Sequence, residues 1–259
     1  MTSEVNLNSD LGESFGPWKM GADGDMLTIV RSANVACGFH ASDPMVMAET
    51  VQLAVKNGVS IGAHPGFPDL QGFGRRVMRL TNAEVEMMTA YQIGALMAVA
   101  VVNGGKVTHV KPHGMMANMA AEDEAMASAI ARATKAVDRG LIFLAQANTA
   151  LSIAGRKAGL RVAEEVFADR TYTDQGLLTP RREANAMIKD ARASVEHVRR
   201  MIEEQAVFSL SGKRIPCQVD SICVHGDEPT AVVTAREVRR GLEASQIRIV
   251  TLPEMRRLR

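Results

Sequence analysis

The run Lys106-Val107-Thr108-His109-Val110-Lys111-Pro112-His113-Gly114 is the stretch that best indicates the fold. Its β-branched residues predict a strand over Lys106–Lys111, which Pro112 and Gly114 end. Alternate residues of a strand share a face, so His109, Lys111 and His113 are expected to lie together. An inward lysine is costly unless it has an anionic partner or ligand. The run therefore predicts a strand that carries polar side chains to a functional site.

The same unit, a short apolar strand followed by a stretch with helical period, recurs along the chain. Asp43-Pro44 predicts one helix start, and Thr81 with Glu84 predicts a capping box at another. Thr179-Pro180 predicts a third start, for a helix that carries Met187 to Ile202 on one apolar stripe. The other predicted strands are Val5–Asp10, Ser32–Gly38, Val59–His64, Leu141–Gln146, Val162–Phe167 and Val219–His225, with Arg248–Leu252 as a weaker eighth.

Strand and helix alternation predicts a parallel sheet, which is either open or closed into a barrel. One polar residue falls at or just after the end of each of six strands. In a barrel these ends meet at one mouth, whereas in an open sheet they spread along an edge. We therefore predict one α/β domain over residues 1–259, a single (β/α) barrel with a small hairpin at about 207–217. The six residues are Asp10, His40, His64, His113, Asp169 and His225.

Composition excludes several classes of function. The chain has 259 residues and a net charge of +1, which gives no field to attract nucleic acid. Three cysteines imply no disulfide framework, and the polar N-terminus does not resemble a signal peptide. The most apolar stretch, Met87–Val102, is shorter than a membrane span and is expected to be a buried helix. We expect a cytoplasmic protein that binds neither nucleic acid nor membrane.

Two motifs near the N-terminus place reactive side chains on loops. Asp10 and Glu13 lie three residues apart and could share a proton, bind a cation or orient water; the alternative is a turn cap and a solvated acid. Cys37 and His40 could form a nucleophile pair, although a buried, inert Cys37 is more common. His197 lies in the middle of a helix among charged residues and is expected at the surface.

Basic residues follow at several strand ends. Arg75 and Arg76 could hold a carboxylate or phosphate, or could simply be solvated. Arg170 follows Asp169, and Asp227 follows His225, so both are further candidates for binding substrate or phosphate. The sequence has no GxxxxGK[ST] loop, no GxGxxG strand–helix turn and no HExxH.

Six blocks of this sequence together resemble the LamB/YcsF family. They occur in order from about residue 4 to residue 252, although Met115-Met116-Ala117 replaces the family's usual small residue, leucine and tyrosine, and Ala41-Ser42-Asp43 replaces Ala-Gly-Asp. The resemblance implies a seven-stranded barrel related to the glycoside hydrolase and deacetylase barrels. It also implies opening of 5-oxoproline to glutamate with ATP, together with subunits B and C. The blocks are Asn8–Glu13, Ser32–His40, Gly62–Asp69, Lys111–Gly114, Phe167–Arg170 and Ile222–Asp227.

This chemistry needs cations for carboxylate and phosphate groups, and a base for water. Candidate catalytic residues are Asp10, Glu13, His40, His64, Lys111, His113, Asp169 and His225. One alternative is a metal-dependent amide or N-acyl hydrolase of the deacetylase type, with a metal on Asp10, His40 and His64. Another is a subunit that binds substrate without catalysis. The cofactors expected are ATP and a divalent metal, either Mg²⁺ with ATP or a bound transition metal. Replacement of Lys111 by methionine is expected to leave the fold intact and to remove activity.

Overall fold

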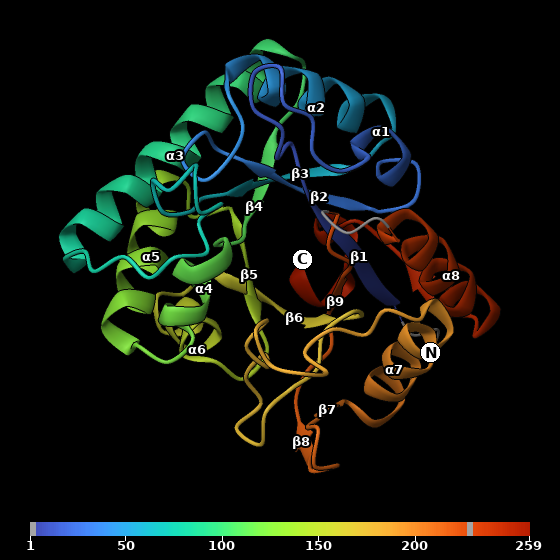
Figure 1. Cartoon of the computed structure of the whole chain (residues 1–259). Helices are drawn as coiled ribbons and strands as arrows, with labels where there is room; N and C mark the ends of the chain where they lie inside the picture. Colours follow the sequence, from blue (N-terminus) through green and yellow to red (C-terminus); the bar gives the residue numbers. More distant parts are fainter. Residues whose placement is uncertain (1–3, 227–229) are drawn as a thin grey trace.

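Seven parallel strands close into a barrel, which confirms the predicted fold. The computed structural model describes residues 4–226 and 230–259, and Figure 1 looks down the barrel. The strands follow chain order around it, and the last pairs with the first at Asn6–Ser221 and Asn8–Cys223. The strands are β1 (Glu4–Leu11), β2 (Ser32–Ala36), β3 (Ser60–His64), β4 (Val107–Val110), β5 (Ile142–Gln146), β6 (Arg161–Phe167) and β9 (Ser221–Cys223).

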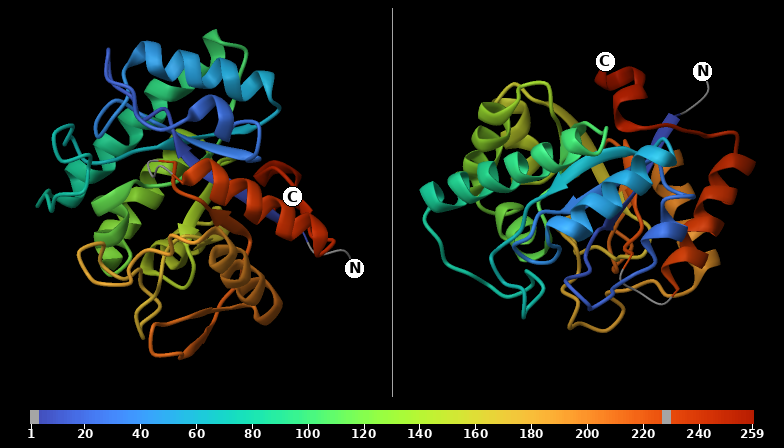
Figure 2. Two further views of the ribbon diagram at one scale, coloured as in Figure 1. Left: turned by 45° about the vertical axis from the view of Figure 1, so that its right-hand side comes forward. Right: turned by 90° about the horizontal axis from the view of Figure 1, so that it is seen from above.

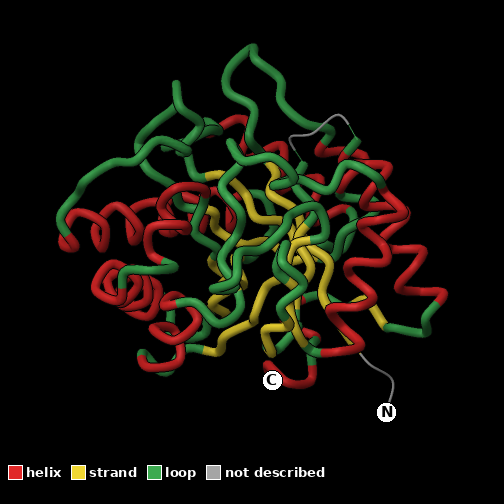
Figure 3. The backbone as a smooth tube through the Cα atoms, turned by 60° about the horizontal axis from the view of Figure 1, so that its bottom comes forward, coloured by secondary structure: helices red, strands yellow, loops and turns green. Residues whose placement is uncertain are grey.

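The weaker eighth strand is not part of the closed barrel. It is reduced to β10 (Arg248–Ile249), which pairs with Glu4 and Val5 at the start of β1. The chain then turns under the barrel in two short 3₁₀ helices, Leu252–Glu254 and Arg256–Leu258. Apolar side chains of this segment pack against Ile142, Leu144 and Ala163 of the strands. Figure 3 shows the C-terminus beneath the strands, so this end of the barrel is closed and the loops at the other end are left for the site.

Helices surround the barrel (Figures 1 and 2). The Asp43 carboxylate accepts hydrogen bonds from the backbone N–H groups of Met45 and Val46, and Thr81 and Glu84 form a capping box. Both predicted helix starts are therefore confirmed. The helices are α1 (Asp23–Met26), α2 (Pro44–Lys56), α3 (Asn82–Val102), α4 (Gly114–Ala120), α5 (Glu124–Val137), α6 (Ala150–Lys157), α7 (Ala191–Glu204) and α8 (Ala231–Ala244).

The predicted helix start at Thr179-Pro180 is wrong. Helix α7 begins at Ala191, with Asp190 accepting a hydrogen bond from the backbone of Ala193. Residues 170–190 form a loop instead, because the buried Arg170 guanidinium donates to the carbonyl oxygens of Thr179 at 2.6 Å and Ala186 at 3.3 Å. Hydrogen bonds from Arg170 to carbonyl groups 9 and 16 positions further along the chain thus override a local helix signal.

Helix α3 is a covering helix and not the fully buried one expected from its composition. By length and composition alone, α3 could cross a membrane. In the structure it packs against α5 and the barrel. Its inward Gln92 bonds to the backbone N–H and carbonyl of Gly66, while Met87 and Tyr91 on the outer face are exposed. The helix therefore anchors the loop that follows β3.

A small antiparallel pair lies between α7 and β9. Strand β7 (Ala206–Phe208) pairs with β8 (Arg214–Pro216), and the turn between them includes Gly212 at φ +87°. The isolated bridge from Tyr172 to Ser209 links the pair to the loop that precedes α7. The pair lies outside the closed barrel (Figure 1).

Candidate functional site

The barrel interior beneath the mouth is polar. Asn8 Nδ2 donates to Glu165 Oε1 at 2.9 Å, and Asn34 Nδ2 donates to Asn8 Oδ1 at 2.8 Å. Asn34 Nδ2 also lies 2.9 Å from Asp10 Oδ1, and His109 Nε2 lies 3.1 Å from Asn34 Oδ1. All five residues are buried. Because buried polar groups are costly unless bonded, this network holds Asp10 and Glu165 in defined positions.

Lys111 lies at the top of this network. Its Nζ atom is 2.9 Å from Asp10 Oδ1, 3.0 Å from Glu165 Oε1 and 3.2 Å from Cys223 Sγ. The side chain is buried among these groups. The inward lysine predicted from the sequence thus has its anionic partners within the protein.

The charges of this group follow from burial and proximity. Burial opposes the charged lysine, but Asp10, Cys223 and Glu165 outweigh it and raise the pKa of Lys111 well above its usual value. Burial also opposes the Asp10 carboxylate, yet His64 and Lys111 hold its pKa well below the ordinary range. Burial raises the pKa of Glu165. The ammonium of Lys111 is therefore balanced mainly by the carboxylate of Asp10.

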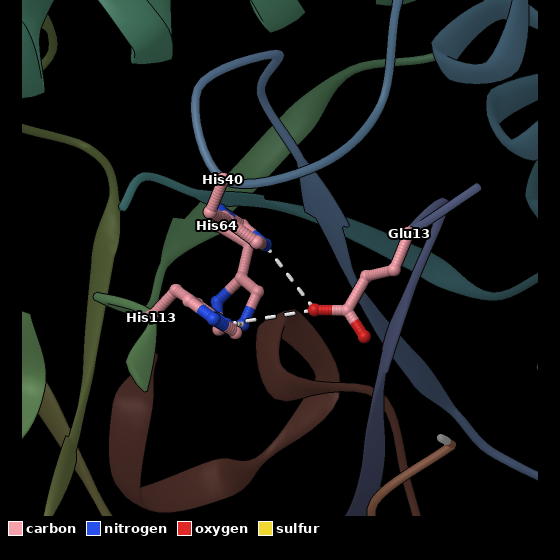
Figure 4. Close-up of side chains that lie close together, drawn as sticks. All are labelled: Glu13, His40, His64 and His113. Atoms are coloured by element: carbon pink, nitrogen blue, oxygen red, sulfur yellow. Dashed lines mark hydrogen bonds and ion pairs between the residues drawn. The ribbon is translucent and has the colours of Figure 1, made fainter. Parts of the chain in front are cut away.

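Three histidines and Glu13 form a second group beside Asp10 (Figure 4). His64 Nε2 lies 3.0 Å from His113 Nδ1, and Glu13 Oε1 lies 3.2 Å from His40 Nε2 and 3.5 Å from His113 Nδ1. The rings of His40 and His113 stack at 3.6 Å between centroids. All four residues are buried. Burial and the neighbouring histidines lower the pKa of both His40 and His113 well below the usual value.

This second group could hold a metal ion. One donor atom from each of Glu13, His40, His64 and His113 lies within 4.8 Å of the other three. The set predicted from the sequence shares His40 and His64 with this group, but its third member, Asp10, lies outside it. Asp10 Oδ1 is taken by Lys111, and Asp10 Oδ2 lies 3.3 Å from His64 Nε2.

Asp169 and His225 make a separate pair at the mouth. His225 Nδ1 lies 3.0 and 2.9 Å from the two Asp169 oxygens, and its ring stacks on Phe167. Burial opposes the Asp169 carboxylate, but His225 and Arg170 lower its pKa. His225 also lies close to Asp10 and Cys223, with donor atoms within 4.8 Å of one another. A pocket opens beside the pair, lined by Met187, Ile188, Lys189, Val224, Thr230, Ala231 and Thr234.

The arginines predicted to bind substrate or phosphate make different contacts. Arg76 pairs with buried Asp69 through Nε at 2.9 Å and also through its second nitrogen. Arg75 lies over the Phe73 ring at 4.8 Å, close enough to His40 and His113 for its charge to lower their pKa values. The Arg170 guanidinium holds the loop before α7. Asp227 lies outside the described residues.

Glu165, Asn8 and Asn34 were not among the candidate site residues. Asn8 and Asn34 lie within the sequence blocks that resemble the family, and Glu165 lies within the strand predicted over Val162–Phe167. The signal that could have found them is a polar side chain on an otherwise apolar strand. Such residues face an interior that must satisfy them.

Two other sequence-based expectations have clear outcomes. Cys37 is buried and its Sγ lies 3.3 Å from the carbonyl oxygen of Val35, so the buried position expected for it is confirmed; burial raises its pKa to about 12. The surface position expected for His197 is wrong. It is half-buried near Tyr172, and burial lowers its pKa to about 4.

Comparison with known proteins adds to this geometry. Residues 5–257 match the family model described as the LamB/YcsF family. This chain belongs to the LamB/YcsF family. Among the relatives of this LamB/YcsF chain is the 5-oxoprolinase A subunit of Azoarcus sp. (strain BH72), which is 51% identical over 97% of this chain and 98% of that protein.

Solved structures give the LamB/YcsF chain the same architecture. The crystal structure of the lactam utilization protein from Thermus thermophilus is 42% identical, has a TM-score of 0.90, and aligns over 96% of this chain and 100% of that one. A structure described as T48 deacetylase with substrate is 15% identical, with a TM-score of 0.51, over 97% of this chain and 89% of that one. This second likeness concerns the fold alone, and it agrees with the predicted barrel.

Proposed function

We propose that this chain is the A subunit of an ATP-dependent 5-oxoprolinase and opens 5-oxo-L-proline to L-glutamate together with subunits B and C. The observation that carries the proposal is the identity of about half of all residues with the 5-oxoprolinase A subunit of Azoarcus over nearly the full length of both chains. The buried acid, base and cation groups at the barrel mouth supply chemistry suited to a small acidic lactam.

The proposed reaction uses ATP because an unstrained five-membered lactam resists hydrolysis. ATP transfers its γ-phosphoryl group to the lactam oxygen and ADP leaves. Water then adds to the activated carbon, the C–N bond breaks, and hydrolysis of the resulting acyl phosphate gives glutamate and phosphate. Mg²⁺ accompanies ATP in this reaction. The proposal also places the protein in the cytoplasm.

The residues have separate roles in this proposal. Asp169 orients His225, which lies at the pocket and serves as the base for water. Lys111 holds Asp10 in its charged form, and Asp10 in turn faces His64. Arg75 supplies positive charge beside the histidines for a carboxylate or phosphate.

The test is glutamate formation from 5-oxoproline by the purified chain, with and without subunits B and C and with and without ATP. We expect turnover only in the complete mixture. The variants His225→Gln and Asp169→Asn should lower turnover by about 100-fold or more, whereas Asp190→Asn, at the cap of α7, should not. Absence of glutamate in the complete mixture would contradict the proposal, and turnover by the chain alone would contradict the role of the partners.

A metal-dependent amide hydrolase is the second candidate function. The cluster of Glu13 with three histidines favours it, because such donor sets bind metals that activate water. Omission of ATP separates the two candidates: this second activity would persist without ATP and would be abolished by a chelator.

A further inference from the structure

The hydrogen bonds of two histidines determine which of their nitrogens carry protons. His64 Nδ1 lies 2.7 Å from the backbone carbonyl oxygen of Lys111, and His113 Nε2 lies 2.8 Å from the backbone carbonyl oxygen of Phe73. A carbonyl oxygen can only accept, so each of these nitrogens donates a proton. In the neutral form of each ring, the other nitrogen therefore carries a bare lone pair.

These two lone pairs point at each other. His64 Nε2 and His113 Nδ1 lie only 3.0 Å apart, and no proton is left to join them when both rings are neutral. Glu13 Oε1, a third acceptor, lies 3.5 Å from His113 Nδ1. Three acceptors that face one another in a buried space repel unless a cation lies between them.

The spacing of these atoms suits a metal ion. Metal–ligand bonds of about 2.0–2.1 Å place neighbouring tetrahedral ligands roughly 3.3 Å apart. His113 Nδ1 lies 3.0 Å from His64 Nε2 and 3.5 Å from Glu13 Oε1, and these two distances lie on either side of that value. Two imidazole nitrogens with one carboxylate oxygen form a donor set typical of transition metals, whereas Mg²⁺ prefers oxygen ligands.

We propose that His64 Nε2, His113 Nδ1 and Glu13 Oε1 bind one divalent transition-metal ion at the barrel mouth. The backbone carbonyls of Lys111 and Phe73 act as the outer partners that orient the two imidazole ligands. Three protein ligands leave a coordination position open, as in metal sites that activate water or polarise a carbonyl group. This site is distinct from the Mg²⁺ that accompanies ATP, and it does not depend on the lactam reaction.

His40 is a positioning residue in this site. Its Nε2 lies 3.2 Å from Glu13 Oε1, and its Nδ1 is buried without a hydrogen-bond partner among the described residues. A ring that bound metal through Nε2 would carry its proton on this unpartnered Nδ1, which is unfavourable. His40 instead donates from Nε2 to Glu13 and holds the carboxylate. Gly66 makes room for it, since a Cβ atom there would lie 2.6 Å from His40 Nδ1.

We assign Asp10 as an outer partner of this site and not as a primary ligand. Its Oδ1 atom accepts from Lys111 and Asn34, and its position places it outside the group of four donor atoms. An ammonium ion 2.9 Å from a carboxylate already neutralises that charge. The variant Asp10→Asn therefore separates this ligand set from one built on Asp10, His40 and His64.

The test is metal binding by the full chain, stripped with a chelator and titrated with Co²⁺ at neutral pH. Calorimetry gives stoichiometry and affinity, and visible absorption reports the ligand geometry around Co²⁺. We expect one ion for each chain. Each of His64→Gln, His113→Gln and Glu13→Gln should weaken binding by about 100-fold or more, and His40→Gln by about 10- to 100-fold.

Matched controls decide the assignment. His197→Gln changes a half-buried histidine on α7 and should retain one Co²⁺ with unchanged affinity and absorption. Asp10→Asn removes a counter-ion that lies 3.3 Å from His64 Nε2, so this variant should still bind one Co²⁺ but more weakly. Circular dichroism and thermal unfolding establish that each variant is folded. Absence of Co²⁺ binding by the wild-type chain would overturn the proposal and would mean that a shared proton joins the two histidines. Equal affinity in all variants, or loss of the ion only in Asp10→Asn, would overturn it as well.

Discussion

Replacement of Lys111 by methionine tests the charge balance inside the barrel. The sequence alone suggests that this change leaves the fold intact, because an inward lysine without a protein partner costs stability. The structure changes that expectation, since Lys111 Nζ lies 2.9 Å from Asp10 Oδ1 and 3.0 Å from Glu165 Oε1. Removal of the ammonium leaves the Asp10 carboxylate buried and uncompensated.

The size of the effect follows from the groups that remain. Loss of one partner from a buried ion pair costs about 3–5 kcal/mol. Asp10 keeps the hydrogen bond from Asn34 and its contact with His64, and burial raises the pKa of Glu165, so that acid stays neutral more easily. We therefore expect the lower limit, about 3 kcal/mol. For a chain of this size that corresponds to a fall in Tm of roughly 6–12 °C.

A double-mutant cycle measures the pair directly. The free energy of unfolding is obtained by urea titration for the wild type, Lys111→Met, Asp10→Asn and the double variant. The double variant has neither charge and should be more stable than Lys111→Met by about 2 kcal/mol. A Lys111→Met protein as stable as the wild type, with a coupling energy near zero, would refute the conclusion that Lys111 and Asp10 compensate each other.

Three further predictions concern stability away from this pair. Asp43→Ala should lower the free energy of unfolding by about 1 kcal/mol in urea titration, because it removes the cap of α2, whereas Asp43→Asn should lose little; equal losses in both would contradict a capping role. Gly62→Ala should destabilise the protein by about 3 kcal/mol or more in the same assay, since its Cβ would lie 2.2 Å from the His109 ring; wild-type stability would show that the ring moves freely. Stability should also fall as the pH falls from about 6.5 toward 4, because burial lowers the pKa of His109 to about 3 and that of His197 to about 4 while both take up protons in the unfolded chain. In His197→Leu, the fall in the free energy of unfolding per pH unit should become smaller by at most about 1.4 kcal/mol. An unchanged dependence on pH would contradict a neutral His197 in the folded protein.

The architecture could be predicted from the sequence because its signals are local. Strand residues alternate with helices whose starts are marked by Asp43-Pro44 and by Thr81 with Glu84, and both starts are confirmed. The start at Thr179-Pro180 carried an equally good local signal and was wrong. There the Arg170 guanidinium binds two loop carbonyls, and no periodic pattern in the sequence reports such a contact.

The interior network could not be predicted because its partners are far apart along the chain. Asn8 and Glu165 are separated by 157 positions, and Asn8 and Asn34 by 26. Each is one polar residue in a strand pattern, and only the closure of the barrel brings them together. Similarly, spacing alone could not separate the roles of Asp10 and Glu13. Gly12, at φ +69°, turns the backbone between them, so Asp10 faces Lys111 while Glu13 faces His40.

Asp10 joins the two groups of the site. One of its oxygens accepts from Lys111, and the other lies 3.3 Å from His64 Nε2, a proposed metal ligand. A cation on His64 and the ammonium of Lys111 would therefore act on the same carboxylate from opposite sides, and both favour its charged form. Asp10 then serves as the common counter-ion of the mouth, fixed by Asn34 from beneath. The hydrogen-bonded polar interior of the barrel therefore holds the Asp10 carboxylate between these two positive charges.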